Sequence, residues 1–76
     1  MEIQDFIASI AELFEDTDAN DLTADTRFKE LAEWSSLIAL SIIAMVDEEY
    51  DVALKGDDIR KSNTIQDLFN IVKENA

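Results

Sequence analysis

Two adjacent serines, Ser35 and Ser36, stand directly before a run of apolar residues that predicts a helix. This order displays a serine hydroxyl at a helix N-terminus, where N–H groups lack intrahelical acceptors and the helix dipole places partial positive charge. A phosphate ester on that hydroxyl would be stabilised by both features. The serine pair is therefore the first candidate for chemistry in this chain.

The residue types of the chain argue against most enzyme chemistry. Its 76 residues include no His and no Cys, and a single Gly. A serine nucleophile needs a base, zinc is held mainly by His and Cys, and a phosphate-binding loop needs several glycines. We expect no catalytic residue. The protein is more plausibly a substrate of enzymes than an enzyme.

The acidic segment 15–27 raises the question of a metal site. Asp16, Asp18 and Asn20 occupy the first, third and fifth positions of an EF-hand loop. The sixth position, which needs Gly, is Asp21, and the twelfth, which needs Glu, is Arg27. We interpret the segment as a solvated loop and expect no metal site, with weak cation binding by its carboxylates as the alternative.

The net charge of -12 limits the partners. An acidic surface repels nucleic-acid phosphates and anionic lipids and attracts proteins with basic patches. Two alternatives are that the acidity only keeps a small protein soluble, or that the chain mimics nucleic acid at a basic site. The longest apolar run, Leu37 to Val46, is too short for the ~20 residues of a membrane span. Without a signal-peptide pattern at the N-terminus, a cytoplasmic protein is expected.

The periodicity of apolar residues predicts an all-α chain that forms one domain, 1–76. Helices are expected at about 3–14, 36–50, 57–61 and 65–73, with a long first loop after the first helix and a turn at Lys55 and Gly56. Leu22 and Phe28 are expected to anchor that loop to the core. Thr64 is the expected cap of the last helix, with Asp67 three residues on. The core stripe of the second helix is expected to be Ala39, Ile42, Ile43, Val46 and Tyr50.

The second helix is apolar on nearly all sides, so part of it should be exposed and sticky. We expect a partner-binding patch around Leu37, Ile38 and Ser41; for Leu40, packing beneath the loops is an equal alternative. Acidic side chains at the end of the helix, Asp47, Glu48 and Glu49, with Glu30 and Glu33 before it, would attract basic partners. The predicted partner-binding residues are Leu37, Ile38, Leu40, Ser41, Ala44, Asp47 and Glu48.

Several short patterns occur in a fixed order along the chain. They are Asp25-Thr26-Arg27-Phe28, Phe28-x-x-Leu31, Glu33-Trp34-Ser35-Ser36-Leu37, Asp47-Glu48-Glu49-Tyr50 and Thr64-Ile65-x-Asp67-Leu68. In this order and spacing, over essentially the whole chain, the sequence resembles the acyl carrier protein family. It is most similar to the branch with Glu-Trp-Asp-Ser-Leu at the serine site.

The resemblance implies a four-helix acyl-carrier-like bundle with a long first loop and a short third helix. It also implies that Ser36 carries 4'-phosphopantetheine, attached by a phosphopantetheinyl transferase that uses coenzyme A and magnesium. Acyl groups would be attached to the arm as thioesters. The carrier would pass them between acyl-transferring and condensing enzymes of fatty-acid, polyketide or related biosynthesis. The family expectation is a monomer.

One residue departs from the family pattern at the serine site. The Asp that precedes the modified serine in the family is Ser35 here, which can still cap the helix but supplies no charge. Ser35 is itself a candidate for modification, although Leu37 fixes the family register on Ser36. The alternative function is an unmodified interaction or regulatory module that binds a biosynthetic enzyme.

Overall fold

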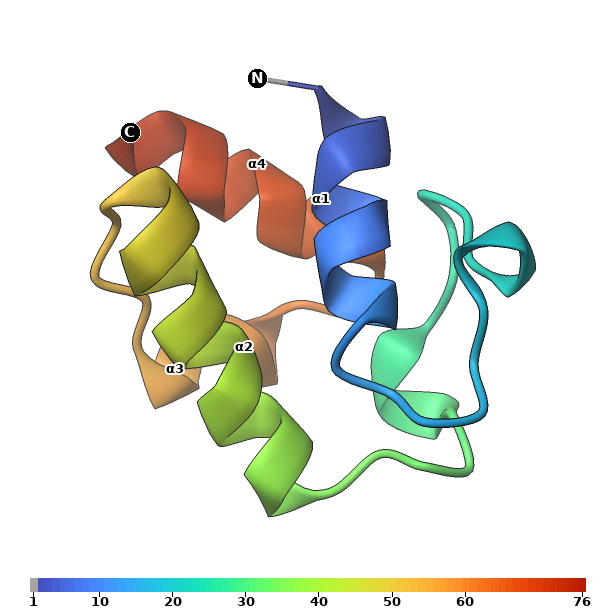
Figure 1. Ribbon diagram of the computed structural model, residues 1–76. Coiled ribbons are helices and arrows are strands. Elements are labelled where there is room, and N and C mark those ends of the chain that lie inside the picture. Colours follow the sequence, from blue (N-terminus) through green and yellow to red (C-terminus); the bar gives the residue numbers. More distant parts are fainter. Residues whose placement is uncertain (1) are drawn as a thin grey trace.

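The computed structural model describes residues 2–76, and this part of the chain folds into helices and contains no strand (Figure 1). The α-helices are α1 (Ile3–Ala11), α2 (Ser36–Tyr50), α3 (Gly56–Lys61) and α4 (Ile65–Asn75). Two short 3-10 turns, η1 (Ala19–Asp21) and η2 (Phe28–Glu30), lie in the long connection between α1 and α2. This confirms the predicted all-α arrangement with a long first loop and a short third helix. None of the described helices has the length and apolar character needed to cross a membrane.

The first helix is shorter than predicted. Its α-helical part ends at Ala11, and the backbone then tightens into bonds of the 3-10 type, from Leu13 N–H to the carbonyl of Ile10 (3.0 Å) and from Phe14 N–H to that of Ala11 (3.1 Å). Such tightening at a helix end satisfies carbonyls that would otherwise lack donors. It also leaves Phe14 buried in the core.

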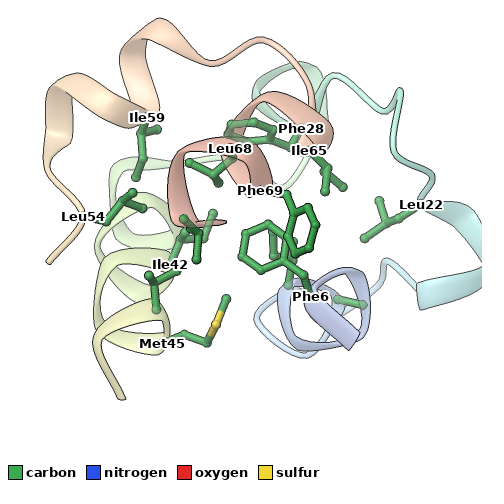
Figure 2. Close-up of a cluster of buried hydrophobic side chains, with 14 of the residues drawn as sticks. Phe6, Leu22, Phe28, Ile42, Met45, Leu54, Ile59, Ile65, Leu68 and Phe69 are labelled. Atoms are coloured by element: carbon green, nitrogen blue, oxygen red, sulfur yellow. The ribbon is translucent and has the colours of Figure 1, made fainter. Parts of the chain in front are cut away.

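The second helix has the predicted bounds, but its buried face is rotated from the predicted stripe. Of the predicted stripe, Ile42 and Val46 are fully buried, and the other members are half-buried and pack against the core: Ala39, Ile43 and Tyr50. Met45, assigned to another face, is buried and points into the same interior as Ile42 (Figure 2). Residues 42, 45 and 46 are neighbours on one face of a helix, so they form a single buried strip.

The core gathers side chains from every α-helix and from the long loop (Figure 2). Phe6 of α1 lies at the centre of the core. The centroid of the Phe6 ring is 5.3 Å from that of Phe69 and 5.8 Å from that of Tyr50. Leu22 and Phe28 are buried, which confirms them as the anchors of the loop. Because these anchors are apolar, the acidic residues between them can remain in water while the loop is fixed at both sides.

The long loop is also hydrogen-bonded to the start of α4. The N–H of Ile65 donates to the carbonyl of Thr26 (3.1 Å), and the N–H of Gln66 donates to that of Ala24 (2.9 Å). Two N–H groups that lack intrahelical acceptors are thus satisfied by a segment some forty residues earlier.

The predicted cap of α4 is present. The hydroxyl of Thr64 accepts from the N–H of Asp67 (3.1 Å), and the carboxylate of Asp67 accepts from the N–H of Thr64 (3.1 Å) and of Asn63 (3.0 Å). This reciprocal arrangement is a capping box. The helix continues to Asn75, which agrees with the expectation that it ends at Lys73 or slightly beyond.

The third helix begins one residue earlier than predicted. Gly56 is its first helical residue rather than part of a preceding turn, and the extended residue before it is Lys55. The carboxylate of Asp58 accepts from the N–H of Lys55 (3.0 Å), which fixes the start of the helix. The backbone therefore needs no left-handed conformation here, and Gly56 has a negative φ.

Candidate functional site

Ser35 and Ser36 have different structural roles at the start of α2. Ser35 is extended (φ -157°, ψ 170°), and its hydroxyl accepts from the N–H of Ile38 at 3.3 Å. Ser36 is the first residue of the helix and is exposed. The capping hydroxyl is thus used within the protein, whereas the hydroxyl of Ser36 is presented to solvent beside the positive end of the helix dipole.

The segment that leads into the serines is held to the core by Trp34. Its ring packs against that of Phe28 in a T-shaped arrangement, with 5.3 Å between ring centroids and 70° between ring planes. The N–H of Trp34 also donates to the carbonyl of Leu31 at 3.0 Å. Because Phe28 is completely buried, this contact fixes the approach to Ser36 relative to the centre of the molecule.

The same segment is held from the other side by Glu33. One oxygen of its carboxylate accepts from the N–H of Glu15 (2.8 Å) and the other from the N–H of Asp16 (3.0 Å). The hydroxyl of Thr17 donates to the second oxygen at 2.8 Å. These bonds join the chain just after α1 to the chain just before α2.

The hydrogen bonds to Glu33 favour its charged form. The Thr17 hydroxyl is the largest cause, and together with the N–H groups of Asp16 and Glu15 it outweighs desolvation, so the pKa of Glu33 lies below its ordinary value. A carboxylate that accepts several such bonds remains ionised to lower pH. Sequence reasoning missed this cluster because its partners are 16 to 18 residues away.

Most of the predicted partner-binding residues do lie on the surface of α2. Leu37 and Leu40 are 71% and 64% exposed, and they are the large hydrophobic residues most open to solvent in the described chain. Ala44, Asp47 and Glu48 are also exposed. The structure therefore brings two exposed leucines and two exposed carboxylates together on one helix, as predicted.

Ile38 and Ser41 fit the predicted patch less well. Ile38 is half-buried and packs against the core, so its side chain belongs partly to the interior. The hydroxyl of Ser41 donates to the carbonyl of Leu37 one turn earlier at 2.9 Å, which satisfies it within the helix. The centre of the exposed patch thus lies at Leu37 and Leu40 rather than at Ile38 and Ser41.

The acidic loop 15–27, which has part of the EF-hand spacing, contains a hydrogen bond between two of its own residues. The N–H of Asp18 donates to the carboxylate of Asp21 at 3.3 Å across η1. Within residues 2–76, no three acidic, His or Cys side chains are grouped as a metal site would require.

Comparison with known proteins decides which family this arrangement belongs to. Residues 3–72 match the family described as the phosphopantetheine attachment site. The chain belongs to the acyl carrier protein family. An acyl carrier protein from Onion yellows phytoplasma (strain OY-M) is 31% identical over 59 residues, which cover 78% of each of the two chains. No solved structure matched the chain at a comparable level of significance.

Acyl carrier proteins hold 4'-phosphopantetheine through a covalent phosphodiester, and this acyl carrier protein has a place that suits such a group. The first turn of α2 begins with an exposed serine. Its first N–H groups have no intrahelical acceptor, and that of Ile38 is satisfied by the Ser35 hydroxyl. A phosphodiester there would add negative charge where the helix dipole favours it. The residues present therefore fit the group.

Proposed function

We propose that residues 1–76 act as a discrete acyl carrier domain whose 4'-phosphopantetheine is attached to Ser36. The observation that supports this proposal is that the two serines have different structural roles. Ser35 uses its hydroxyl to cap α2, while Ser36 is exposed at the first helical position. A carrier needs a tether that a transferase can reach. Both serines are exposed, but the hydroxyl of Ser35 is engaged in the cap, which favours Ser36 as the tether.

The attachment step requires little of this chain beyond presenting Ser36. Coenzyme A supplies the arm when it is bound by the phosphopantetheinyl transferase. The oxygen of Ser36 forms a new bond to phosphorus and loses its proton to the transferase, and adenosine 3',5'-bisphosphate leaves. The start of α2 stabilises the resulting phosphodiester anion. The chain itself contributes no catalytic group and acts as a substrate and carrier.

Docking of partner enzymes is assigned to the exposed side of α2. Leu37 and Leu40, with Ala44 between them and the helix end, offer apolar contact. Asp47 and Glu48 offer charge to basic patches, which speeds encounter more than it adds affinity. We propose the transferase and acyl-transferring or condensing enzymes as these partners, with a monomeric carrier acting in the cytoplasm in fatty-acid, polyketide or related biosynthesis. Neither nucleic acid nor a membrane is a partner in this proposal.

Ser35 supports a second candidate function. At the position where the family has Asp, this chain offers a neutral hydroxyl, so the charge that helps present the site to the transferase and its metal is missing. A chain that escaped modification would serve as an interaction or regulatory module, binding a biosynthetic enzyme through the same face of α2.

Intact mass spectrometry separates the two functions. The protein is incubated with a promiscuous phosphopantetheinyl transferase, coenzyme A and magnesium, together with Ser36→Ala and Ser35→Ala. A mass gain equal to one arm in the wild type and in Ser35→Ala, and none in Ser36→Ala, supports the carrier. A gain that persists in Ser36→Ala would move the attachment to another residue. No gain with any of several transferases would favour the unmodified module.

A further inference from the structure

The carboxylate of Glu33 lies three residues before Ser36 and binds the loop that leaves α1. Its two oxygens receive donors from three consecutive residues, which are the N–H of Glu15, the N–H of Asp16 and the hydroxyl of Thr17. The distances of 2.8 to 3.0 Å are those of well-formed charge-assisted hydrogen bonds. No other acidic side chain in the described chain is shown with as many donors.

The bonds of Glu33 complement the contact made by the next residue. Trp34 packs on the buried ring of Phe28, and its backbone N–H is bound by Leu31. Trp34 therefore holds the segment before α2 against the core, while Glu33 holds the same segment against the first loop. With these two attachments next to each other, the direction in which the chain enters α2 is set at two points.

We propose that Glu33 is a positioning residue for the attachment reaction: it holds the loop 15–17 against the entry to α2 and so fixes where Ser36 is presented to the transferase. This inference rests on the proposed function of Ser36. Glu33 does not touch the reacting atoms. It acts through Trp34 and Ser35, because a shift of the segment before the helix start displaces the capping serine and the hydroxyl beside it.

The geometry also argues against a simple surface role for Glu33. A carboxylate that only attracted basic partners would point into solvent, as those of Asp47 and Glu48 are free to do. The carboxylate of Glu33 instead has both oxygens engaged by its own chain. Its charge serves to satisfy backbone N–H groups at an exposed bend, which would otherwise be left to water alone.

The test compares four variants. Glu33→Gln keeps the shape of the side chain but replaces one acceptor oxygen with a donor that faces the N–H groups. Thr17→Val removes the hydroxyl at the other side of the same contact. Glu12→Gln removes the same charge from an exposed side chain at the end of α1, and Val72→Ala destabilises the core at α4, away from the serines.

Two measurements are made on each variant, the rate of arm attachment at varied carrier concentration and the hydrogen exchange of individual amides. For Glu33→Gln we expect kcat/KM to fall roughly 10-fold, within the ~100-fold that a displacement of about 1 Å costs a reacting group. The hydrogen-bonded amides of residues 15, 16, 34 and 38 should exchange faster, while those of α4 should not. Thr17→Val should share this defect, and the double variant should be no worse than Glu33→Gln alone.

The controls distinguish positioning from a loss of charge or of stability. Glu12→Gln should be modified like the wild type, and Val72→Ala should lower the melting temperature without lowering kcat/KM at a temperature where it is folded. If Glu33→Gln is modified at the wild-type rate, or if Val72→Ala loses as much activity, the positioning role is overturned. If the wild type itself accepts no arm, the proposed function fails. The role of Glu33 is then decided by the exchange of the hydrogen-bonded amides of Trp34 and Ile38, which must become faster in Glu33→Gln if the proposal is correct.

Discussion

The rings of Trp34 and the buried Phe28 form a T-shaped pair, and this contact connects the core to the serine site. Phe28 belongs to η2 in the long loop, and Trp34 leads directly into Ser35 and Ser36. A residue whose first role is to fill the core thus also determines where the exposed hydroxyl lies.

Phe28→Ala should therefore affect both stability and modification. Removing a fully buried phenylalanine typically costs about 3–5 kcal/mol, a large part of the stability of a small domain. We expect a much lower urea midpoint and slower arm attachment under conditions where the variant is folded. Phe28→Leu, which keeps apolar volume but no aromatic face, should recover most of the stability. A Phe28→Ala variant with an unchanged midpoint would contradict the burial described here.

The rotated face of α2 makes a second prediction. Ile42→Ala should lower the free energy of unfolding by about 2–5 kcal/mol, because Ile42 is completely buried. Leu40→Ala, a matched truncation on the exposed side of the same helix, should change it by no more than about 0.5 kcal/mol. Chemical denaturation of the two variants measures the difference. Equal losses would mean that the buried strip runs through another set of residues.

Ser35→Asp should raise the rate of arm attachment. An Asp can accept from the N–H of Ile38 as Ser35 does, so the cap is retained, and it adds the negative charge that the family presents to the transferase and its metal. Ser35→Ala loses the cap and should cost about 0.5–2 kcal/mol of stability. Initial rates at limiting carrier concentration provide the comparison. A slower Ser35→Asp would show that the charge is not what the transferase needs from this position.

The acidic end of α2 should control how fast partners find the carrier. Asp47→Asn combined with Glu48→Gln removes two exposed charges without touching the core. We expect a lower kcat/KM with a transferase that has a basic docking patch, and a weaker dependence of that rate on ionic strength. The melting temperature should be nearly unchanged. A rate that stays equally sensitive to salt would place the attracting charges elsewhere.

The capping box of α4 gives a prediction about acid. The N–H groups of Asn63 and Thr64 are the main causes that hold the pKa of Asp67 below its ordinary value of 3.8. A carboxyl with a lowered pKa in the folded state contributes stability above its ordinary pKa, and this contribution is lost as the pH falls through the folded value. The wild type should be more stable than Asp67→Asn at neutral pH, and the gap should narrow below pH 3.8. Urea midpoints of both proteins at several pH values measure the gap, and a constant gap would be the contrary result.

The parts of the fold that local sequence signals specify were predicted correctly. Ser35 and Thr64 are short polar residues before apolar runs, and both mark the start of a helix. The end of α1 and the burial of Met45 were not predicted, because both depend on how neighbouring elements pack. The periodicity of apolar residues could not predict the burial of Met45, because α2 is apolar on several sides and its sequence allows more than one buried face.

The candidate site divides in the same way. The exposure of Ser36 and Leu37 follows from position on one helix, so the sequence predicted it, whereas for Leu40 the sequence left packing beneath the loops as an equal alternative. The role of Glu33 depends on residues 15 to 17, which only the folded backbone brings to it. In the sequence Glu33 is one acid among many, and its type alone does not distinguish an internal hydrogen-bond acceptor from a solvated charge.

The hydrogen bonds that the first amides of α4 donate to the carbonyls of Thr26 and Ala24 have a consequence for how the chain reaches its fold. Contacts between segments so distant along the chain require a large loop to close, and such closure slows folding relative to purely local helix formation. The last helix can form its own turns early, but its leading amides find their acceptors only when the loop has settled on the core. The long first loop and the last helix therefore pack together in one step, and a split between α2 and α3 should yield two fragments that reach stable tertiary packing only when mixed.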